Sequence, residues 1–394
     1  MKAKVLNGID QLEKLDYYIG DKRVALVTGG ASITRNLEQA VDVLASRYNV
    51  RKLFNTIYGI RGEFIYGEHV EQYTDEKTGL LVESIFNRKL TAPSKEMLDQ
   101  VDVVIYDIKE AGTRYYEYLY CLANLMKACA RDKKHLVVLD RVNPINGITV
   151  EGTVCSQDMH TMIGDYCLAT RTGMTTGEFA NYVNTEFGIS VDLTVIPVEG
   201  WKRQMYMDDT DLLWVLPSPS LPHVNANILY TGMCIFEGIS SINEGRGTSK
   251  PFELIGAPWM DAEQITRRMN RRNLPGVAFS PVHYIPRSSK YKDKIVFGVQ
   301  THILCRNVIE PFRIAVNLFD EIQSLHANEI VFTDCNAGHD VKEGEGIQFT
   351  RYFDKLLGTD ALSTGRMDGD TLIDYYAEAR EDYIRRKMKY HLYE

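Results

Sequence analysis

The residues most able to do chemistry lie in the segment 237–248, which reads Glu-Gly-Ile-Ser-Ser-Ile-Asn-Glu-Gly-Arg-Gly-Thr. Glu237 and Glu244 are seven residues apart on this glycine-rich stretch, so their carboxyl groups can approach one bound molecule. Paired carboxyl groups are what the cleavage of a glycosidic bond requires. A structural salt bridge within the loop, for instance from Glu244 to Arg246, is the alternative interpretation.

A second cluster follows the apolar run at residues 101–107. Asp107 ends this run, and Arg114 and Tyr116 come from the turn and helix start after it. Carboxylates accept hydrogen bonds from sugar hydroxyls, a guanidinium grips a carboxylate such as a lactyl group, and aromatic rings stack on sugar rings. The set therefore suits a hydroxyl-rich ligand, although a helix start with interfacial tyrosines would use the same residue types.

A second carboxylate, Asp140, ends the apolar run at residues 136–140, and Asn143 follows it. Because the carboxyl ends of parallel strands meet at one edge of a sheet, where open sheets bind ligands, we expect Asp107 and Asp140 to face one crevice.

A third polar cluster, at residues 60–69, contains Arg61, Glu63 and Glu68. It has no hydrophobic period and predicts a loop after the second strand. A solvated, charged loop without function is an equally good interpretation of this cluster taken alone.

The elements that would position these side chains alternate between short β-branched runs and helical patterns, which predicts βαβ units on a parallel sheet. The sequence predicts strands at residues 23–28, 50–54, 101–107, 135–139 and 193–196, and helices at residues 37–48, 116–131 and 176–187.

The chain changes character after residue 214. Residues 214–259 are rich in Pro, Gly, Asn and Ser with little periodicity, which predicts functional loops. The sequence then predicts helices at 261–273, 309–324 and 368–387, with a strand at 295–302. The fold class is therefore α/β: a Rossmann-like parallel-sheet domain at residues 1–228, followed by a smaller α+β domain at residues 229–394, with a cleft between them.

Cofactor chemistry has little support in the sequence. Gly29 and Gly30 follow the first strand, but the spacing Gly-x-Gly-x-x-Gly of a dinucleotide site is absent. We instead expect a tight turn in which both glycines adopt positive φ. The nine His residues are dispersed without metal-site spacing, so neither a metal nor an organic cofactor is expected.

Composition limits the partners. The formal net charge is −8 and no run of Lys or Arg could track phosphates, so a nucleic-acid partner is not expected. The charged first residues lack the apolar stretch of a secretory signal, and prolines interrupt the longest uncharged stretch. With seven cysteines and no Cys-x-x-Cys pair, the expectation is a cytoplasmic protein without a membrane span. The 23 Tyr and 14 Phe residues leave a homodimer open.

Taken together, these motifs resemble the exo-β-N-acetylmuramidase family over nearly the whole chain. The matching blocks include Gly59-Ile60-Arg61-Gly62, residues 107–118, Asp140-Arg141-Val142-Asn143-Pro144, Gly173-Met174-Thr175, Pro217-Ser218-Pro219, residues 244–248 and Gly256-Ala257-Pro258-Trp259. The resemblance implies a Rossmann-like amino-terminal domain and a cleft that takes N-acetylmuramic acid from the non-reducing end of peptidoglycan fragments.

Three segments depart from the family pattern. Where the family usually has Glu-His before Gly-Ile-Arg-Gly, this chain has Ile57 and Tyr58. Thr172 replaces the family's His before Gly-Met-Thr, and residues 28–32 replace its Thr-Asn-Pro-Thr-Gly turn. The changes remove proton-transfer groups from the region where a substrate is expected.

Two hypotheses follow. In the first, the protein is a muramidase-type glycoside hydrolase acting on muropeptide-derived or related amino sugars. Glu244 or Glu237 is then the general acid or base and Glu63 or Glu68 replaces the missing acid. The remaining candidates bind the sugar: Asp107, Asp140, Tyr116 and Asn143 at the ring and hydroxyls, and Arg61, Arg114 and Arg246 at an acidic substituent. In the second, a divergent homologue has kept the cleft but lost hydrolysis, and binds a sugar or catalyses another reaction.

Overall fold

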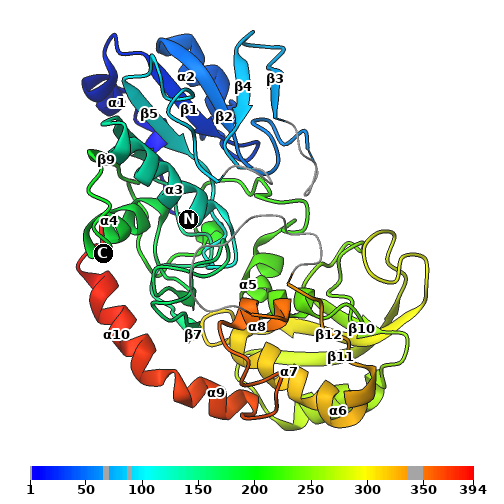
Figure 1. Cartoon of the computed structure of the whole chain (residues 1–394). Helices are drawn as coiled ribbons and strands as arrows, with labels where there is room; N and C mark the ends of the chain where they lie inside the picture. Colours follow the sequence, from blue (N-terminus) through cyan, green and yellow to red (C-terminus); the bar gives the residue numbers. More distant parts are fainter. Residues whose placement is uncertain (1, 65–70, 87–90, 336–348) are drawn as a thin grey trace.

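A seven-stranded, mostly parallel sheet organises the amino-terminal part of the computed structural model, which describes residues 2–64, 71–86, 91–335 and 349–394. The strand order is β3-β4-β2-β1-β5-β6-β9, and the edge strand β3 runs antiparallel to its neighbour (Figure 1). The strands are β1 (Val24–Thr28), β2 (Val50–Asn55), β3 (Gln72–Thr74), β4 (Leu81–Ser84), β5 (Val103–Asp107), β6 (His135–Leu139) and β9 (Leu193–Ile196). The order reverses between β1 and β5, as in doubly wound sheets, which bind ligands beyond the carboxyl ends of such strands.

Helices cover both faces of this sheet because its central strands are apolar on both sides. All residues of β1 and β5 are buried. Val24 and Leu26 belong to an apolar cluster with α1 and α2, whereas Val27 and Tyr106 belong to a second cluster with α3 and α4. These elements are η1 (Gly8–Asp10), α1 (Leu12–Ile19), α2 (Ala40–Arg47), α3 (Tyr118–Arg131) and α4 (Thr176–Glu186).

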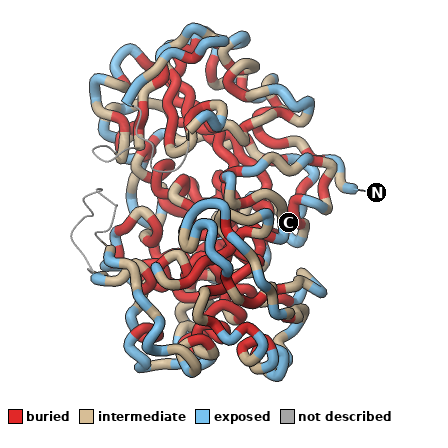
Figure 2. Tube along the Cα trace, turned by 90° about the vertical axis from the view of Figure 1, so that its right-hand side faces the viewer, coloured by how far each residue is buried: buried red, intermediate tan, exposed pale blue. Residues whose placement is uncertain are grey.

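The carboxyl-terminal part is built on a three-stranded antiparallel sheet of order β10-β12-β11. Its elements are α5 (Val224–Met233), η3 (Cys234–Gly238), β10 (Leu254–Ala257), α6 (Ala262–Arg271), β11 (Val277–Tyr284), β12 (Val296–Ile303), α7 (Pro311–His326), η4 (Ala327–Glu329) and α8 (Tyr352–Leu357). Three short elements lie outside these two sheets. Strands β7 (Glu151–Val154) and β8 (Ala169–Arg171) form a two-stranded sheet between β6 and α4 in the chain, and η2 (Met207–Asp209) follows β9. Figure 2 shows buried segments running through both parts.

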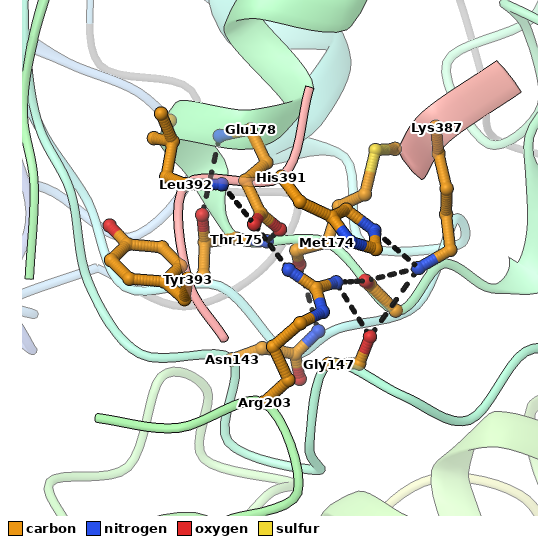
Figure 3. A network of polar contacts seen from close by, with 12 residues as sticks. Asn143, Gly147, Met174, Thr175, Glu178, Arg203, Lys387, His391, Leu392 and Tyr393 are labelled. Carbon is orange, nitrogen blue, oxygen red and sulfur yellow. Dashed lines mark hydrogen bonds and ion pairs between the residues drawn. The ribbon is translucent and has the colours of Figure 1, made fainter. Parts of the chain in front are cut away.

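The end of the chain returns to the amino-terminal part. After α9 (Gly369–Tyr375), α10 (Ala377–Met388) runs back towards α4 (Figure 1). Two hydrogen bonds hold this end of the chain in place. Lys387 Nζ donates to the carbonyl oxygen of Gly173 at 2.8 Å. The Leu392 N–H donates to Glu178 Oε1 at 2.9 Å, as Figure 3 shows.

The structure confirms the predicted α/β fold class with its large parallel sheet. Strands 135–139 and 193–196 have the predicted bounds. The proposed division at residue 228 falls inside α5, which packs against α7. Among the described helices, none is long and apolar enough to cross a membrane.

Three local predictions were wrong. Residues 214–259 contain α5, η3 and β10 besides loops, because α5 is buried on nearly every side and so shows no amphipathic period. The single helix predicted at 368–387 is two, separated at Tyr376. Gly29 and Gly30 do not have positive φ. Gly30 is instead packed so closely that a Cβ atom would lie 2.6 Å from the backbone of Arg61.

Candidate active site

A cavity of about 330 Å³, called here the central cavity, is lined by residues from both parts of the chain. Its polar and charged lining residues are Tyr58, Tyr115, Tyr116, Glu117, Ser218, Ser220, Tyr230, Glu237, Glu244, Arg246, Lys290, Thr333 and Tyr352. Of the predicted site residues, the structure brings together here Glu237, Glu244, Arg246 and Tyr116.

Two carboxylates of the central cavity contact the same guanidinium. Arg246 Nη2 lies 2.6 Å from Glu237 Oε1, and Arg246 Nε lies 3.3 Å from Glu244 Oε1. The Glu244 side chain is 2% exposed and also pairs with Lys290, whose Nζ lies 2.9 Å from its Oε2. The Glu237 side chain is 21% exposed. Glu237 is therefore the more accessible acid, and Glu244 is held between two cations.

The loop that carries Glu244 and Arg246 is shaped by Asn243 and Gly245. Asn243 Oδ1 accepts from the Gly245 N–H at 2.8 Å, and Asn243 Nδ2 donates to the carbonyl oxygens of Arg246 and Lys290. Gly245 has φ +79°, and a Cβ there would lie 2.6 Å from the Lys250 carbonyl oxygen. Only glycine fits both constraints, so the sequence at 243–246 fixes where Glu244 and Arg246 point.

Aromatic rings form much of the wall. Tyr230 and Phe252 meet edge to face with ring centroids 4.9 Å apart, and the Arg246 guanidinium lies 5.2 Å from the Phe252 ring centroid. The Tyr116 hydroxyl donates to the carbonyl oxygen of Pro217 at 2.6 Å, which holds the segment 217–221 against the cavity. Rings beside carboxylates and a guanidinium suit the apolar faces and polar rim of a sugar.

Ile57 and Tyr58, which replace the Glu-His of the family pattern, both line the central cavity. The Tyr58 hydroxyl lies 3.3 Å from Ser218 Oγ. Burial raises the pKa of Tyr58 above its usual value, so the phenol keeps its proton at neutral pH. The departure from the family therefore falls inside the candidate site itself.

Arg61 and Glu63 lie away from the central cavity. All three guanidinium nitrogens of Arg61 donate to the carboxylates of Asp42 and Asp75, at distances between 2.6 and 3.4 Å. Exposed Glu63 accepts from the Tyr73 hydroxyl at 2.6 Å. Glu68 lies outside the described residues, so its predicted role stays a prediction.

The expectation that Asp107 and Asp140 face one crevice does not hold. Asp107 is fully buried and binds Arg141 through both oxygens, at 2.6 and 2.8 Å. Asp140 accepts from Thr175, Tyr393 and the Gly177 N–H instead. Burial raises the pKa of Asp140 to about 6. Neither residue lines the central cavity, because each side chain is turned towards its own protein partners.

Arg114 and Asn143 are likewise engaged in buried contacts outside the central cavity. Arg114 donates to the carbonyl oxygens of Thr153 and Leu356, each at 2.7 Å, and so joins β7 to α8. Asn143 Nδ2 donates to the Met174 carbonyl oxygen at 2.8 Å, within the network of Figure 3.

Sequence reasoning missed two lysines. Lys290 contacts Glu244 across 46 residues of sequence, from an aperiodic loop between β11 and β12 that gives no local signal. Lys109 follows Asp107 by two residues, at the carboxyl end of a buried strand. This position could have identified it as a candidate, because open parallel sheets bind ligands at this edge. Within the described ranges, no group of three or more His, Cys, Asp or Glu side chains is placed to hold a metal ion.

Comparison with known proteins shows which family the chain belongs to. The profile of the amino-terminal domain of exo-beta-N-acetylmuramidase NamZ matches residues 24–225, and that of its carboxyl-terminal domain matches residues 228–393. The peptidoglycan beta-N-acetylmuramidase NamZ of Bacillus subtilis is 35% identical, covering 100% of this chain and 92% of that protein.

Two crystal structures of DUF1343 family proteins from Bacteroides fragilis have the same fold. One is 29% identical with a TM-score of 0.88, and the other is 27% identical with a TM-score of 0.76. Each comparison covers 99% of both chains. The chain therefore belongs to the exo-β-N-acetylmuramidase NamZ family.

Proposed function

We propose that this protein is a glycosidase that removes N-acetylmuramic acid, or a related amino sugar, from the non-reducing end of small peptidoglycan-derived glycans in the central cavity. The observation that carries the proposal is the pair Glu237 and Glu244 on one guanidinium, inside an aromatic-walled cavity of a chain from the NamZ family. Glycosidic-bond cleavage uses two carboxyl groups facing one sugar.

The two acids have different surroundings, which suggests different roles. Glu237 is the more exposed and is the better placed to exchange a proton with a bound sugar. Glu244 lies between Arg246 and Lys290, and its charge holds both cations at the cavity wall. We assign proton transfer to Glu237 and electrostatic stabilisation of the oxocarbenium-like transition state to Glu244.

The test is the release of a chromophore from a β-linked N-acetylmuramide by the unaltered protein, Glu237→Gln and Glu244→Gln. Both substitutions keep the side-chain shape, and each is expected to lower kcat/KM by at least about 100-fold. Glu321→Gln is the matched control, because Glu321 pairs with Arg268 and Arg272 outside the central cavity. Equal activity in all four proteins would exclude the assignment.

Ile57 and Tyr58 favour a second candidate, a homologue that binds the sugar without cleaving it. These residues line the cavity at the position where the family pattern has Glu-His. This candidate predicts saturable binding of N-acetylmuramic acid with no chromophore release, and a gain of release in the double variant I57E/Y58H. Release by the unaltered protein that is lost in Glu237→Gln would exclude it.

A further inference from the structure

A second cavity, called here the loop cavity, adjoins the central cavity and has a volume of about 190 Å³. Its walls are residues 29–32 after β1, Ile108 and Lys109 after β5, the segment 215–219, and the side chains or backbone of Tyr58, Arg61, Gly62, Phe64 and Tyr118. The carboxyl ends of β1 and β5 flank the reversal in strand order, which is where open α/β sheets bind ligands. Tyr58 and Ser218 line both cavities, so their contact marks the boundary between them.

Lys109 brings a buried positive charge to the loop cavity. Its Nζ donates to the Val215 carbonyl oxygen at 2.6 Å and lies 4.2 Å from the Trp214 ring centroid. Among the described residues, it takes part in no ion pair with a carboxylate. Because burial and the nearby charge of Arg141 both disfavour the ammonium form, the pKa of Lys109 falls to about 7.

Carboxylates close to the loop cavity are already paired with arginines. Arg61, on the same cavity, already binds Asp42 and Asp75, and Arg141 binds both oxygens of Asp107. A buried charge that lacks a partner is costly unless something compensates it. A bound anion would do so.

The loop after β1 adds hydrogen-bond donors at the same place. The backbone N–H groups of Gly30 and Ala31 donate to none of the described residues. A Cβ atom at Gly29 would meet no heavy atom within 4 Å, so the backbone there is open to a ligand. Two free N–H groups and an ammonium are a donor set for a carboxylate.

We propose that the loop cavity binds the carboxylate of an acidic sugar whose ring occupies the central cavity, and that Lys109 selects acidic sugars over neutral ones. The inference rests on the proposed function, which places the sugar ring in the central cavity. The acidic substituent of that ring then passes beside Tyr58 into the loop cavity. N-Acetylmuramic acid and N-acetylglucosamine differ by a lactyl carboxylate, so they are the natural pair of probes.

The experiment is equilibrium binding followed by the fluorescence of Trp214, which the contact with Lys109 makes a local reporter. The ligands are N-acetylmuramic acid, N-acetylglucosamine, D-lactate and inorganic phosphate, and Trp214→Phe assigns the signal. The unaltered protein is expected to bind N-acetylmuramic acid at least about 10-fold more tightly than N-acetylglucosamine. Lys109→Met is expected to weaken the acidic sugar by about 10- to 100-fold and leave the neutral sugar unchanged.

Two further variants keep the test sharp. Lys134→Met is the matched control, because Lys134 also donates to a backbone carbonyl, that of Val101 at 2.7 Å, but lines neither cavity. Should Lys109→Met fail to fold, Lys109→Gln removes the charge and keeps a polar N–H donor at this position. The comparison of the two sugars on unaltered protein needs no variant.

The outcomes separate this inference from the proposed function. Equal affinity for both sugars, or an equal loss of both in Lys109→Met, would overturn the role of Lys109 while leaving sugar binding intact. Binding of lactate or phosphate that depends on Lys109, without binding of either sugar, would overturn the assignment to an acidic sugar and mark a site for small anions. Binding of neither sugar would remove the proposed function and this inference with it.

Discussion

The hydroxyl of Tyr58 lies 3.3 Å from Ser218 Oγ, and this contact marks the boundary between the central and loop cavities. Tyr58 follows β2, whereas Ser218 belongs to the segment before α5. The contact therefore joins two segments 160 residues apart at the point where a substituent would pass.

We expect the Tyr58 and Ser218 side chains to be energetically coupled. Tyr58→Phe and Ser218→Ala each remove one partner of the same hydrogen bond, so the double variant should be more stable than the sum of the single effects by about 0.5–1.5 kcal/mol. Urea unfolding of the four proteins measures this coupling. Additive effects would show that the contact contributes nothing to stability.

Arg246 is expected to be essential for both activity and local stability. Arg246→Met removes the cation shared by Glu237 and Glu244 and should lower kcat/KM by at least about 100-fold. The free energy of unfolding should fall by about 1–3 kcal/mol, a moderate value because the Arg246 side chain is 32% exposed. Arg287→Met is the control, since Arg287 pairs with Asp293 at the exposed surface. Similar losses in both variants would argue against a special role for Arg246.

The protonated form of Lys109 should lower the free energy of unfolding, so the effect of Lys109 on stability should depend on pH. Its pKa is about 7 in the folded protein and near 10.5 when exposed, so the unfolded chain binds more protons between these values. The cost of burying the ammonium is thus fully present below pH 7 and is relieved as the pH rises. Lys109→Met should gain most over the unaltered protein near pH 6 and less near pH 9.5, as measured by urea unfolding. A gain that is independent of pH would contradict a buried charge.

Asp140 should act on stability rather than on substrate binding. Burial raises its pKa from 3.8 to about 6, so the folded protein binds the extra proton in this range and loses stability as the pH rises through it. The free energy of unfolding of Asp140→Asn, relative to the unaltered protein, should therefore rise between about pH 4 and pH 6 and stay level above. KM for an N-acetylmuramide should stay within about 3-fold. A large rise in KM would instead support the prediction that Asp140 binds the sugar.

The sequence by itself determined the parallel sheet and the segment 237–248, which carries Glu237 and Glu244. The apolar run at 136–139 predicts a buried central strand, and β6 is buried over these residues. The strands predicted at 135–139 and 193–196 have the bounds that the structure shows. Glu237, Glu244 and Arg246 are close in the chain, and the turn at Gly245, which requires a positive φ, is local, so their meeting follows from the short stretch of residues between η3 and this turn.

Only the tertiary structure decided which charged groups stay available. Asp107, Asp140, Arg61 and Arg114 have residue types suited to a sugar site, but packing gives each of them protein partners distant in sequence. The same packing brings Lys290 to Glu244 and leaves Lys109 buried without a carboxylate among the described residues. Whether a charge is compensated depends on neighbours brought together by long-range contacts, and neither residue type nor local spacing carries that information.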